Sequence, residues 1–452
     1  AVDVAEISDV VTNELKKAGS RLVKFTIQKD EYDLPDFAFI MSQYEKITKL
    51  MRDGVIRSAQ AVDGNGVADA VAKMAFGNKI GAKFCKHKPK EYFFTPGYGE
   101  IVAEIDEEDL AVLDAAGVSY DKIGKTLDKP QFECDDEVIS MEEALSAWSG
   151  TLEKVFPTRS GVEDKEINTG LYDTKDIYVC KHKVAKPSVF IPVFPGQNCE
   201  YDSARAFEEA GAVADVFIIR NLTAQAIDES VEKMVSMIKN SQIVMLPGGF
   251  SAGDEPDGSG KFIANVLNNK DIAEEIHRLL DRGGLILGIC NGFQALVKSG
   301  LLPYGRLGMV TRESPTLFRN DINRHVSQIV STRVATTNSP WLSSFSVGDI
   351  HSIAVSHGEG KFVVNEPLAR ELFENGQVAF QYVDAEGRVT AEAPYNPNGS
   401  YYAIEGIVSR DGQILGKMGH TERYGENLFK NIAGEKVQDI FTNAVNYFRK
   451  TK

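Results

Sequence analysis

The hydrophobic and polar positions predict alternating strands and helices from about Pro187 onward. Short apolar runs predict strands at 188–194, 213–219, 242–246 and 285–289, of which the first is expected to be buried. Helix-like stretches lie between them at 200–210, 228–239 and 260–281. Strands that alternate with helices of this length are typical of right-handed βαβ units. The pattern therefore predicts an α/β domain with a doubly wound parallel sheet, whose ligands bind at the carboxyl ends of the strands.

The first 155 residues mix strand-like and helix-like segments without this regular alternation. A strand is predicted at 21–27 and helices at 35–51 and 67–76, the second after the turn Asp63-Gly64-Asn65-Gly66. From about residue 156 to 186 the periodicity is lost and proline, glycine and charged residues gather, which is typical of a linker. We therefore expect a smaller α+β domain (1–155), a linker (156–186) and the α/β domain (187–452).

Composition narrows the class of protein. Hydrophobic residues make up 43% of the 452 residues and charged residues 25%, which is ordinary for a globular protein. No apolar run reaches the ~18 residues of a spanning helix, and no secretory leader opens the chain. The five cysteines form no CxxC pair, so neither a metal site nor a disulfide framework is expected. We expect a cytoplasmic protein that contacts no membrane.

Charge argues against a nucleic-acid partner. The formal net charge is −15, and residues 101–150 alone hold 14 acidic against 3 basic side chains. Phosphate backbones are bound by clustered Lys and Arg, and a strongly acidic chain is not expected to take nucleic acid as its main partner. The acidic excess is interpreted as a solvated surface.

Cys290 lies at the end of a predicted strand, in Gly288-Ile289-Cys290-Asn291-Gly292, and a helix follows at once. The spacing Gly-x-Cys-x-Gly is the cysteine counterpart of the nucleophile elbow, in which flanking glycines permit a sharp strand-to-helix turn. The helix N-terminus favours a thiolate over a thiol. Cys290 is therefore predicted to be a nucleophile.

Attack on a carbonyl requires backbone donors for the oxyanion. One candidate is the amide of Asn291, the first residue of the helix after the nucleophile. The other is the amide of Gly249, in the turn Pro247-Gly248-Gly249-Phe250 after the preceding strand.

A cysteine nucleophile also needs a base with an orienting partner. Two His-x-Glu pairs follow predicted strands, His357 with Glu359 and His420 with Glu422. Spacing alone does not choose between them.

Five ordered motifs carry a family resemblance over roughly Pro187 to the C-terminus. They are Pro-Gly-Gly-Phe (247–250), Gly-Ile-Cys-Asn-Gly-Phe-Gln (288–294), His-Gly-Glu-Gly (357–360), Tyr-Asn-Pro-Asn-Gly-Ser (395–400) and Gly-His-Thr-Glu-Arg (419–423). Together they resemble the class I glutamine amidotransferase domain, a flavodoxin-like fold, of the phosphoribosylformylglycinamidine synthase family. Less specifically, residues 1–155 resemble the C-terminal domain of aminoimidazole ribotide synthetase.

The resemblance implies roles for individual residues. His420 would be the general base and Glu422 its orienting partner, whereas His357 and Glu359 would line the glutamine pocket or a domain contact. Gln294, Phe250 and Asp254 would help to bind glutamine. The family usually has Pro-His-Pro-Glu at the catalytic pair, so Gly419 and Thr421 are expected to loosen that turn.

The implied activity is hydrolysis of glutamine to supply ammonia for making formylglycinamidine ribonucleotide from formylglycinamide ribonucleotide, a step of purine biosynthesis. The chain itself would need no cofactor, while ATP and Mg²⁺ would act in synthetase domains upstream in the same polypeptide. Because Ala1 is not a methionine, we expect this chain to be the C-terminal portion of a longer one. Two alternatives stay open: another cysteine hydrolase of the same fold, and a scaffold module that is silent without its synthetase domains.

Overall fold

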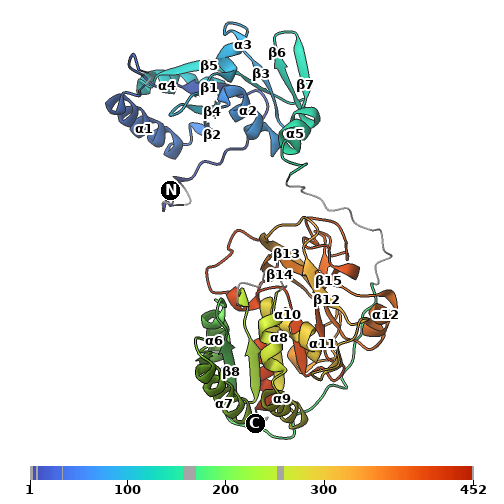
Figure 1. Cartoon of the computed structure of the whole chain (residues 1–452). Helices are drawn as coiled ribbons and strands as arrows, with labels where there is room; N and C mark the ends of the chain where they lie inside the picture. Colours follow the sequence, from blue (N-terminus) through green and yellow to red (C-terminus); the bar gives the residue numbers. More distant parts are fainter. Residues whose placement is uncertain (1–3, 7–8, 33, 156–168, 252–258, 450–452) are drawn as a thin grey trace. The chain divides into compact units, whose positions relative to one another are not determined.

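The computed structural model describes residues 4–6, 9–32, 34–155, 169–251 and 259–449 (Figure 1). The chain divides into two compact units, Ala1–Phe156 and Pro157–Lys452. Part of the expected linker, 156–168, lies outside the described residues. The later part is bonded to the second unit, because the Tyr172 amide donates to the carbonyl of Ala335 at 3.0 Å. Within the described ranges, no helix has the length and apolar character needed to cross a membrane.

The first unit is built on a mostly antiparallel sheet. Its strands are β1 (Arg21–Phe25), β2 (Ile56–Ala61), β3 (Gly81–Phe84), β4 (Ile101–Ile105), β5 (Tyr120–Leu127), β6 (Gln131–Cys134) and β7 (Glu137–Ser140). Its helices are α1 (Phe37–Arg52), α2 (Gly66–Phe76), α3 (Lys90–Phe94), α4 (Leu110–Ala116) and α5 (Met141–Gly150). The strand order is β2-β4-β1-β5-β3-β6-β7, and only β3 and β6 pair in parallel. The helices expected at 35–51 and 67–76 are α1 and α2.

Both faces of this sheet carry a hydrophobic core. Successive side chains of a strand point to opposite faces, and in β1 Leu22 joins the cluster that contains Val71 of α2. The next residue, Val23, joins the cluster that contains Ile47 of α1 and Leu113 of α4. Helix α2 therefore covers one face and helices α1 and α4 the other.

The acidic stretch of this unit is only partly a solvated surface. Glu104 of β4 is fully buried, and its carboxylate accepts hydrogen bonds from the amides of Lys16 and Lys17 at 2.7 and 3.1 Å. Asp106 is paired with Lys17 at 2.6 Å and with Arg57. The expectation of a solvated acidic face is wrong at these two positions, because Glu104 is turned toward the Lys16 and Lys17 amides and Asp106 is covered by its two ion-pair partners.

The second unit contains the larger sheet. Its strands are β8 (Ser188–Val193), β9 (Val213–Ile218), β10 (Ile243–Leu246), β11 (Leu285–Ile289), β12 (Thr316–Arg319), β13 (Val326–Val334), β14 (Ile350–His357), β15 (Glu359–Val363), β16 (Val378–Val383), β17 (Ile404–Val408) and β18 (Ile414–Lys417). Its helices are α6 (Glu200–Glu209), α7 (Ala224–Asn240), α8 (Lys261–Leu267), α9 (Lys270–Asp281), α10 (Asn291–Ser299), α11 (Leu301–Tyr304), α12 (Glu366–Glu374) and α13 (Ile440–Phe448).

The order of the larger sheet is β14-β13-β16-β17-β18-β11-β10-β8-β9. Strands β9, β8, β10, β11 and β18 are parallel. Numbered along the chain, these five strands have the order 2-1-3-4-5 of flavodoxin-like folds. The predicted parallel, doubly wound sheet is thus confirmed for this half. Antiparallel strands β17, β16, β13 and β14 extend it. The sequence predicted β14 as the strand before His357 but did not predict the other three or this extension of the sheet.

Helices cover both faces of the parallel half. The chain reverses its direction of travel across the sheet after β9, so right-handed crossovers place α6 on one face and α7, α9 and α10 on the other. Contacts of α7 with α9 and of α6 with α13 agree with this arrangement.

The helix expected at 260–281 is two helices, α8 and α9. Asn269 caps α9, because its side-chain oxygen accepts hydrogen bonds from the amides of Asp271 and Ile272. Asparagine competes with the helix backbone in this way, so the periodicity continues while the helix is interrupted.

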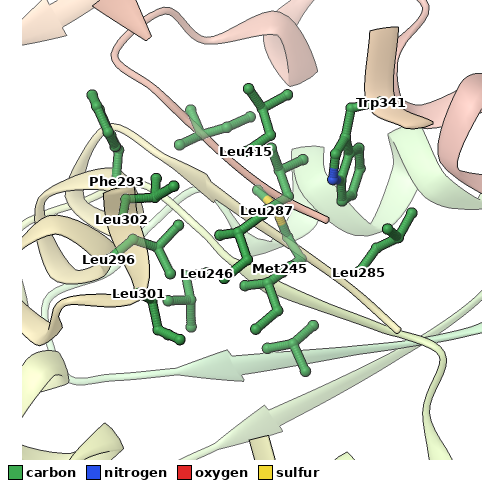
Figure 2. Close-up of a cluster of buried hydrophobic side chains, with 14 of the residues drawn as sticks. Met245, Leu246, Leu285, Leu287, Phe293, Leu296, Leu301, Leu302, Trp341 and Leu415 are labelled. Carbon is green, nitrogen blue, oxygen red and sulfur yellow. The ribbon is translucent and has the colours of Figure 1, made fainter. Parts of the chain in front are cut away.

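The apolar core of the second unit lies directly beneath the ends of the central strands (Figure 2). Leu287 of β11 and Leu415 of β18 meet Met245 of β10 and Phe293 of α10 in one buried cluster. Close packing of this kind resists displacement of the strand ends. The core therefore fixes the positions of the loops that follow β10, β11 and β18.

Candidate active site

Cys290 occupies a strained turn between β11 and α10. Its φ of 51° and ψ of −105° lie outside the regions that ordinary residues adopt. A Cβ added at Gly292 would lie 2.0 Å from the carbonyl oxygen of Leu246, and one at Gly288 would lie 2.7 Å from the backbone of Gly292. Both flanking positions therefore require glycine, as expected for a nucleophile elbow.

The elbow holds the Cys290 thiol in a protected position. The side chain is buried, with 5% of its surface exposed, and its Sγ lies 3.7 Å from the carbonyl oxygen of Ser356. Its amide donates to the carbonyl of Lys417 at 2.8 Å, which ties the elbow to β18. Because α10 begins at the next residue, the partial positive charge of the helix lies at the sulfur.

His420 and Glu422 form a direct pair in the turn after β18. Nδ1 of His420 lies 2.6 Å from Oε1 of Glu422, and both side chains are buried. Burial alone would lower the pKa of His420, but the Glu422 carboxylate and Cys290 outweigh it and raise that pKa well above the ordinary value. Burial would raise the pKa of Glu422, yet His420 holds it below the usual range. Nε2 of His420 is buried with no hydrogen-bond partner among the described residues.

Gly248 brings these groups together. A Cβ added there would lie 2.8 Å from Cε1 of His420 and 3.4 Å from Cβ of Cys290. The nucleophile and the imidazole therefore both lie next to the space left by the missing side chain of Gly248.

The second His-x-Glu pair has a different arrangement. Nδ1 of His357 lies 3.2 Å from Oδ1 of Asn320, and Oε2 of Glu359 accepts a hydrogen bond from the Ser259 amide at 2.8 Å. Burial, with the neighbouring imidazoles of His420 and His325, lowers the pKa of His357 to about 3. His357 is therefore neutral, and it is oriented by an amide side chain rather than by a carboxylate.

The glycine turn after β10 is pinned to the loop after β8. The Gln197 side chain donates to the carbonyl of Pro247 at 2.7 Å, and the Phe250 amide donates to the carbonyl of Gly196 at 2.9 Å. Gly249 has a φ of 133°, and a Cβ there would lie 2.5 Å from Cα of Gln197. Only glycine fits this approach, so the turn holds a fixed backbone position beside the elbow.

The residues expected to bind glutamine have three different outcomes. Gln294 is buried, accepts a hydrogen bond from the Asn291 side chain at 3.1 Å and donates to the carbonyl of Glu359. Phe250 is 47% exposed, and its ring centroid lies 6.1 Å from that of His325. Asp254 lies outside the described residues. Gln294 thus joins the helix of the nucleophile to the loop of Glu359.

Cys199 and Arg423 were not predicted to belong to the site. Sγ of Cys199 lies 3.3 Å from Nη2 of Arg423 and 4.0 Å from Nδ1 of His420. Cys199 follows the turn after β8. Because ligands bind at the carboxyl ends of parallel strands, this position could have predicted that Cys199 lies near the site. Within the described part of the chain, Cys199, His420 and Glu422 are the one group with metal-ligand spacing. The guanidinium of Arg423 at the thiol disfavours a cation there.

Comparisons with known proteins cover this unit. Residues 186–448 match the family of CobB/CobQ-like glutamine amidotransferase domains. The chain is 37% identical over 283 residues to the phosphoribosylformylglycinamidine synthase subunit PurQ of Methanococcus maripaludis strain C7, covering 58% of this chain and 98% of that relative. It is 33% identical over 257 residues to the same subunit of Salinibacter ruber, covering 57% and 95%.

A chain of the solved PurLQS structure from Thermotoga maritima shares 28% identity with a TM-score of 0.43, covering 58% of this chain and 100% of that one. This likeness is too low to carry an argument. The family match covers more than half of the chain, and the matched residues contain the elbow and both histidine pairs. The chain therefore belongs to the CobB/CobQ-like glutamine amidotransferase family, as the glutaminase portion of a phosphoribosylformylglycinamidine synthase of purine biosynthesis.

Proposed function

We propose that Cys290, His420 and Glu422 form the triad that hydrolyses glutamine. The observation that carries the proposal is the 2.6 Å contact between His420 and Glu422 beside a strained cysteine elbow. The other His-x-Glu pair has no such contact among the described residues, and it offers a neutral imidazole. An imidazole whose pKa is raised beside a thiol favours the thiolate–imidazolium pair that nucleophilic catalysis by cysteine requires.

The proposed reaction has two halves. The Cys290 thiolate attacks the side-chain amide carbon of glutamine, and the tetrahedral oxyanion collapses to a glutamyl thioester. His420 gives its Nε2 proton to the departing ammonia. The neutral imidazole then takes a proton from water, whose oxygen attacks the thioester and releases glutamate and the thiolate. Glu422 stays ionised and stabilises the imidazolium.

The oxyanion is proposed to bind to the amides of Gly249 and Asn291. Asn291 belongs to the first turn of α10, whose amides point out of the helix end. Gly249 is held by the contacts of Gln197 and Phe250 with their neighbours. Preorganised donors of this kind are worth about 10²–10³-fold in rate each.

The glutamine pocket is proposed to be lined by His357, Glu359, Gln294 and Phe250. Support comes from their convergence near the elbow: Cys290 touches Ser356, and Gln294 bonds to Glu359. Asp254, outside the described residues, remains a predicted member of this pocket.

The ammonia is proposed to be used by a synthetase portion that converts formylglycinamide ribonucleotide with ATP and Mg²⁺. The word subunit in the names of the PurQ relatives supports an assembly of this kind. We further propose that the synthetase domains lie upstream in the same polypeptide, that the first unit is the aminoimidazole-ribotide-synthetase-like C-terminal domain, and that the enzyme works in the cytoplasm. The antiparallel sheet of that unit, with a glycine turn before α2, is compatible with this assignment.

Replacement of the nucleophile tests the proposal. Cys290→Ala is expected to abolish glutamate release and covalent labelling by a glutamine-analogue electrophile. Cys180→Ala is the matched control, because Cys180 is also buried in the second unit but bonds to the carbonyl of His182. Glutamate release should be compared with and without a synthetase partner, ATP and ribonucleotide. Release only with the partner would favour the silent-scaffold alternative for the isolated chain, whereas unchanged labelling of Cys290→Ala would refute the nucleophile.

A further inference from the structure

A buried ion pair lies beside the turn that carries His420. Lys417 is the last residue of β18 and Glu405 belongs to the neighbouring strand β17. Neither side chain has exposed surface, and Nζ of Lys417 lies 3.6 Å from Oε1 of Glu405. Burying two charges costs free energy unless further hydrogen bonds satisfy them. The groups that form hydrogen bonds with Lys417 and Glu405 therefore matter for the stability of this pair.

Those contacts converge on the residues that flank His420. Nζ of Lys417 donates to the carbonyl of Gly419 at 3.0 Å and to Oγ1 of Thr421 at 2.8 Å. The Gly419 amide donates to Oε1 of Glu405 at 2.5 Å. The Thr421 hydroxyl donates to Oε1 of Gln438 at 2.7 Å. Each residue next to His420 is thus bonded to one or both members of the buried pair.

The same contacts explain why glycine and threonine can stand where the resemblance implies prolines. A Cβ at Gly419 would lie 2.7 Å from Cγ2 of Ile353 and 2.9 Å from Oε1 of Glu405. Proline would also remove the N–H that Gly419 donates to Glu405. The sequence suggested a loosened turn, and this expectation is wrong. Side-chain hydrogen bonds to Gly419 and Thr421 restrain the turn in place of proline rings.

We propose that Lys417 and Glu405 are positioning residues, which hold the His420 imidazole between Cys290 and Glu422 by clamping Gly419 and Thr421. Neither residue touches the reacting atoms. This inference rests on the proposed triad and deepens it. Burial lowers the pKa of Lys417, and the carboxylates of Glu405 and Glu422 oppose that shift.

The hydroxyl of Thr421 offers the sharpest test. Thr421→Val removes the acceptor of the lysine without changing the volume of the side chain, and Thr421→Ser keeps it. Thr332→Val is the matched control, because Thr332 is fully buried in β13 and its hydroxyl has no partner among the described residues. The readout on the full chain is alkylation of Cys290 by 6-diazo-5-oxo-norleucine, measured as the saturating rate constant and the half-saturating concentration.

For Thr421→Val we expect a saturating rate about tenfold below wild type with an unchanged half-saturating concentration, since the pocket is intact and only the base is displaced. Thr421→Ser and Thr332→Val should remain within about twofold of wild type. Equal rates for the valine and serine variants, or an equal loss in Thr332→Val, would overturn the clamp. If Thr421→Val does not fold, the double variant Lys417→Met, Glu405→Gln removes both charges of the clamp together and should give the same rate effect.

Cys290→Ala distinguishes failure of the proposed triad from failure of the proposed clamp. If that variant is still alkylated at the wild-type rate, the triad itself is wrong. If it is inert while Thr421→Val, or the double variant Lys417→Met, Glu405→Gln, matches wild type, the triad stands and the clamp is refuted.

Discussion

The second unit contains two segments with the spacing His-x-Glu, and they have different backbone conformations. Glu422 lies in a 3₁₀ turn, Thr421–Arg423, directly after His420, and the imidazole and the carboxylate meet at 2.6 Å. His357 ends β14 and Glu359 opens β15, and these two side chains bond to Asn320 and to the Ser259 amide instead. Identical spacing therefore produces a charged pair in one place and a neutral imidazole in the other.

The difference shows that the orienting partner decides the role of a histidine. A carboxylate at Nδ1 stabilises the imidazolium, whereas an amide oxygen does so much less. Burial is nearly complete for His420 and His357 alike, so burial cannot distinguish them. Matched substitutions in the His420–Glu422 and His357–Glu359 pairs can therefore test which histidine is the base.

The largest difference is expected between the two histidines. His420→Asn should lower kcat for glutamate release by about 10³–10⁴-fold, because general base and acid are lost together. His357→Asn should lower kcat by less than about tenfold and mainly raise KM for glutamine, because His357 is proposed to line the pocket rather than to act as the base. Steady-state assays of the complete enzyme distinguish these outcomes. Losses of equal size would mean that the assignment of the base is wrong.

A smaller difference is expected between the two glutamates. Glu422→Gln should lower kcat by about 10²–10³-fold, since the carboxylate no longer stabilises the imidazolium although the shape is kept. Glu359→Gln keeps an acceptor for the Ser259 amide and should change KM by about tenfold or less. The same assay serves, and a larger kcat loss for Glu359→Gln than for Glu422→Gln would reverse the two roles.

The smallest expected difference is between the pH ranges in which His357 and His420 bind a proton, and it can be measured directly. His357 has a pKa of about 3 against an ordinary value of 6.5, so the unfolded chain binds its proton first as the pH falls. This site should therefore destabilise the second unit between pH 6 and 4, by at most ~1.4 kcal/mol per pH unit. The pKa of His420 is raised, so its stabilising contribution is present below pH 6.5 and is lost as pH rises through the folded pKa.

Histidine Cε1–H resonances followed by NMR from pH 5 to 8 would measure both signs. His357 should show no titration in this range and His420 should remain protonated at its acidic end, with His357→Gln and His420→Gln used to assign the signals. Titration of the His357 signal near pH 6.5 would contradict its burial as a neutral group.

Much of the fold follows from periodicity. The parallel strands β8, β10 and β11 and their helices were predictable because each of these buried strands is a short apolar run between amphipathic helices. Strand β9 was also predicted, although Val213, Val216 and Ile218 are exposed. The strand before His357, which is β14, was predicted without its place in the sheet. The antiparallel strands β13, β16 and β17 were missed, since their alternating and mixed residues resemble loops when taken one at a time. The break between α8 and α9 was hidden because Asn268 and Asn269 do not interrupt the apolar period.

The candidate site was predictable where chemistry is local in the chain. Cys290 and its flanking glycines lie within five residues, so the nucleophile elbow could be predicted from the sequence. Cys199 could have been proposed from its place after the turn that follows β8, but Arg423, Lys417 and Glu405 could not, because Arg423 contacts a cysteine more than 200 residues away and the other two take their role from complete burial. Charged side chains are expected at the surface, and only the packed structure shows that Lys417 and Glu405 are not there.

The small space at Gly248 has a consequence for substitution at this position. A single added carbon there would lie 2.8 Å from the His420 ring and 3.2 Å from Sγ of Cys199, so at least one of these side chains would have to move. The positions nearest this carbon belong to the proposed catalytic groups rather than to the apolar core. Gly248→Ala is therefore expected to disturb the imidazole and the nucleophile before it disturbs the packing of the sheet.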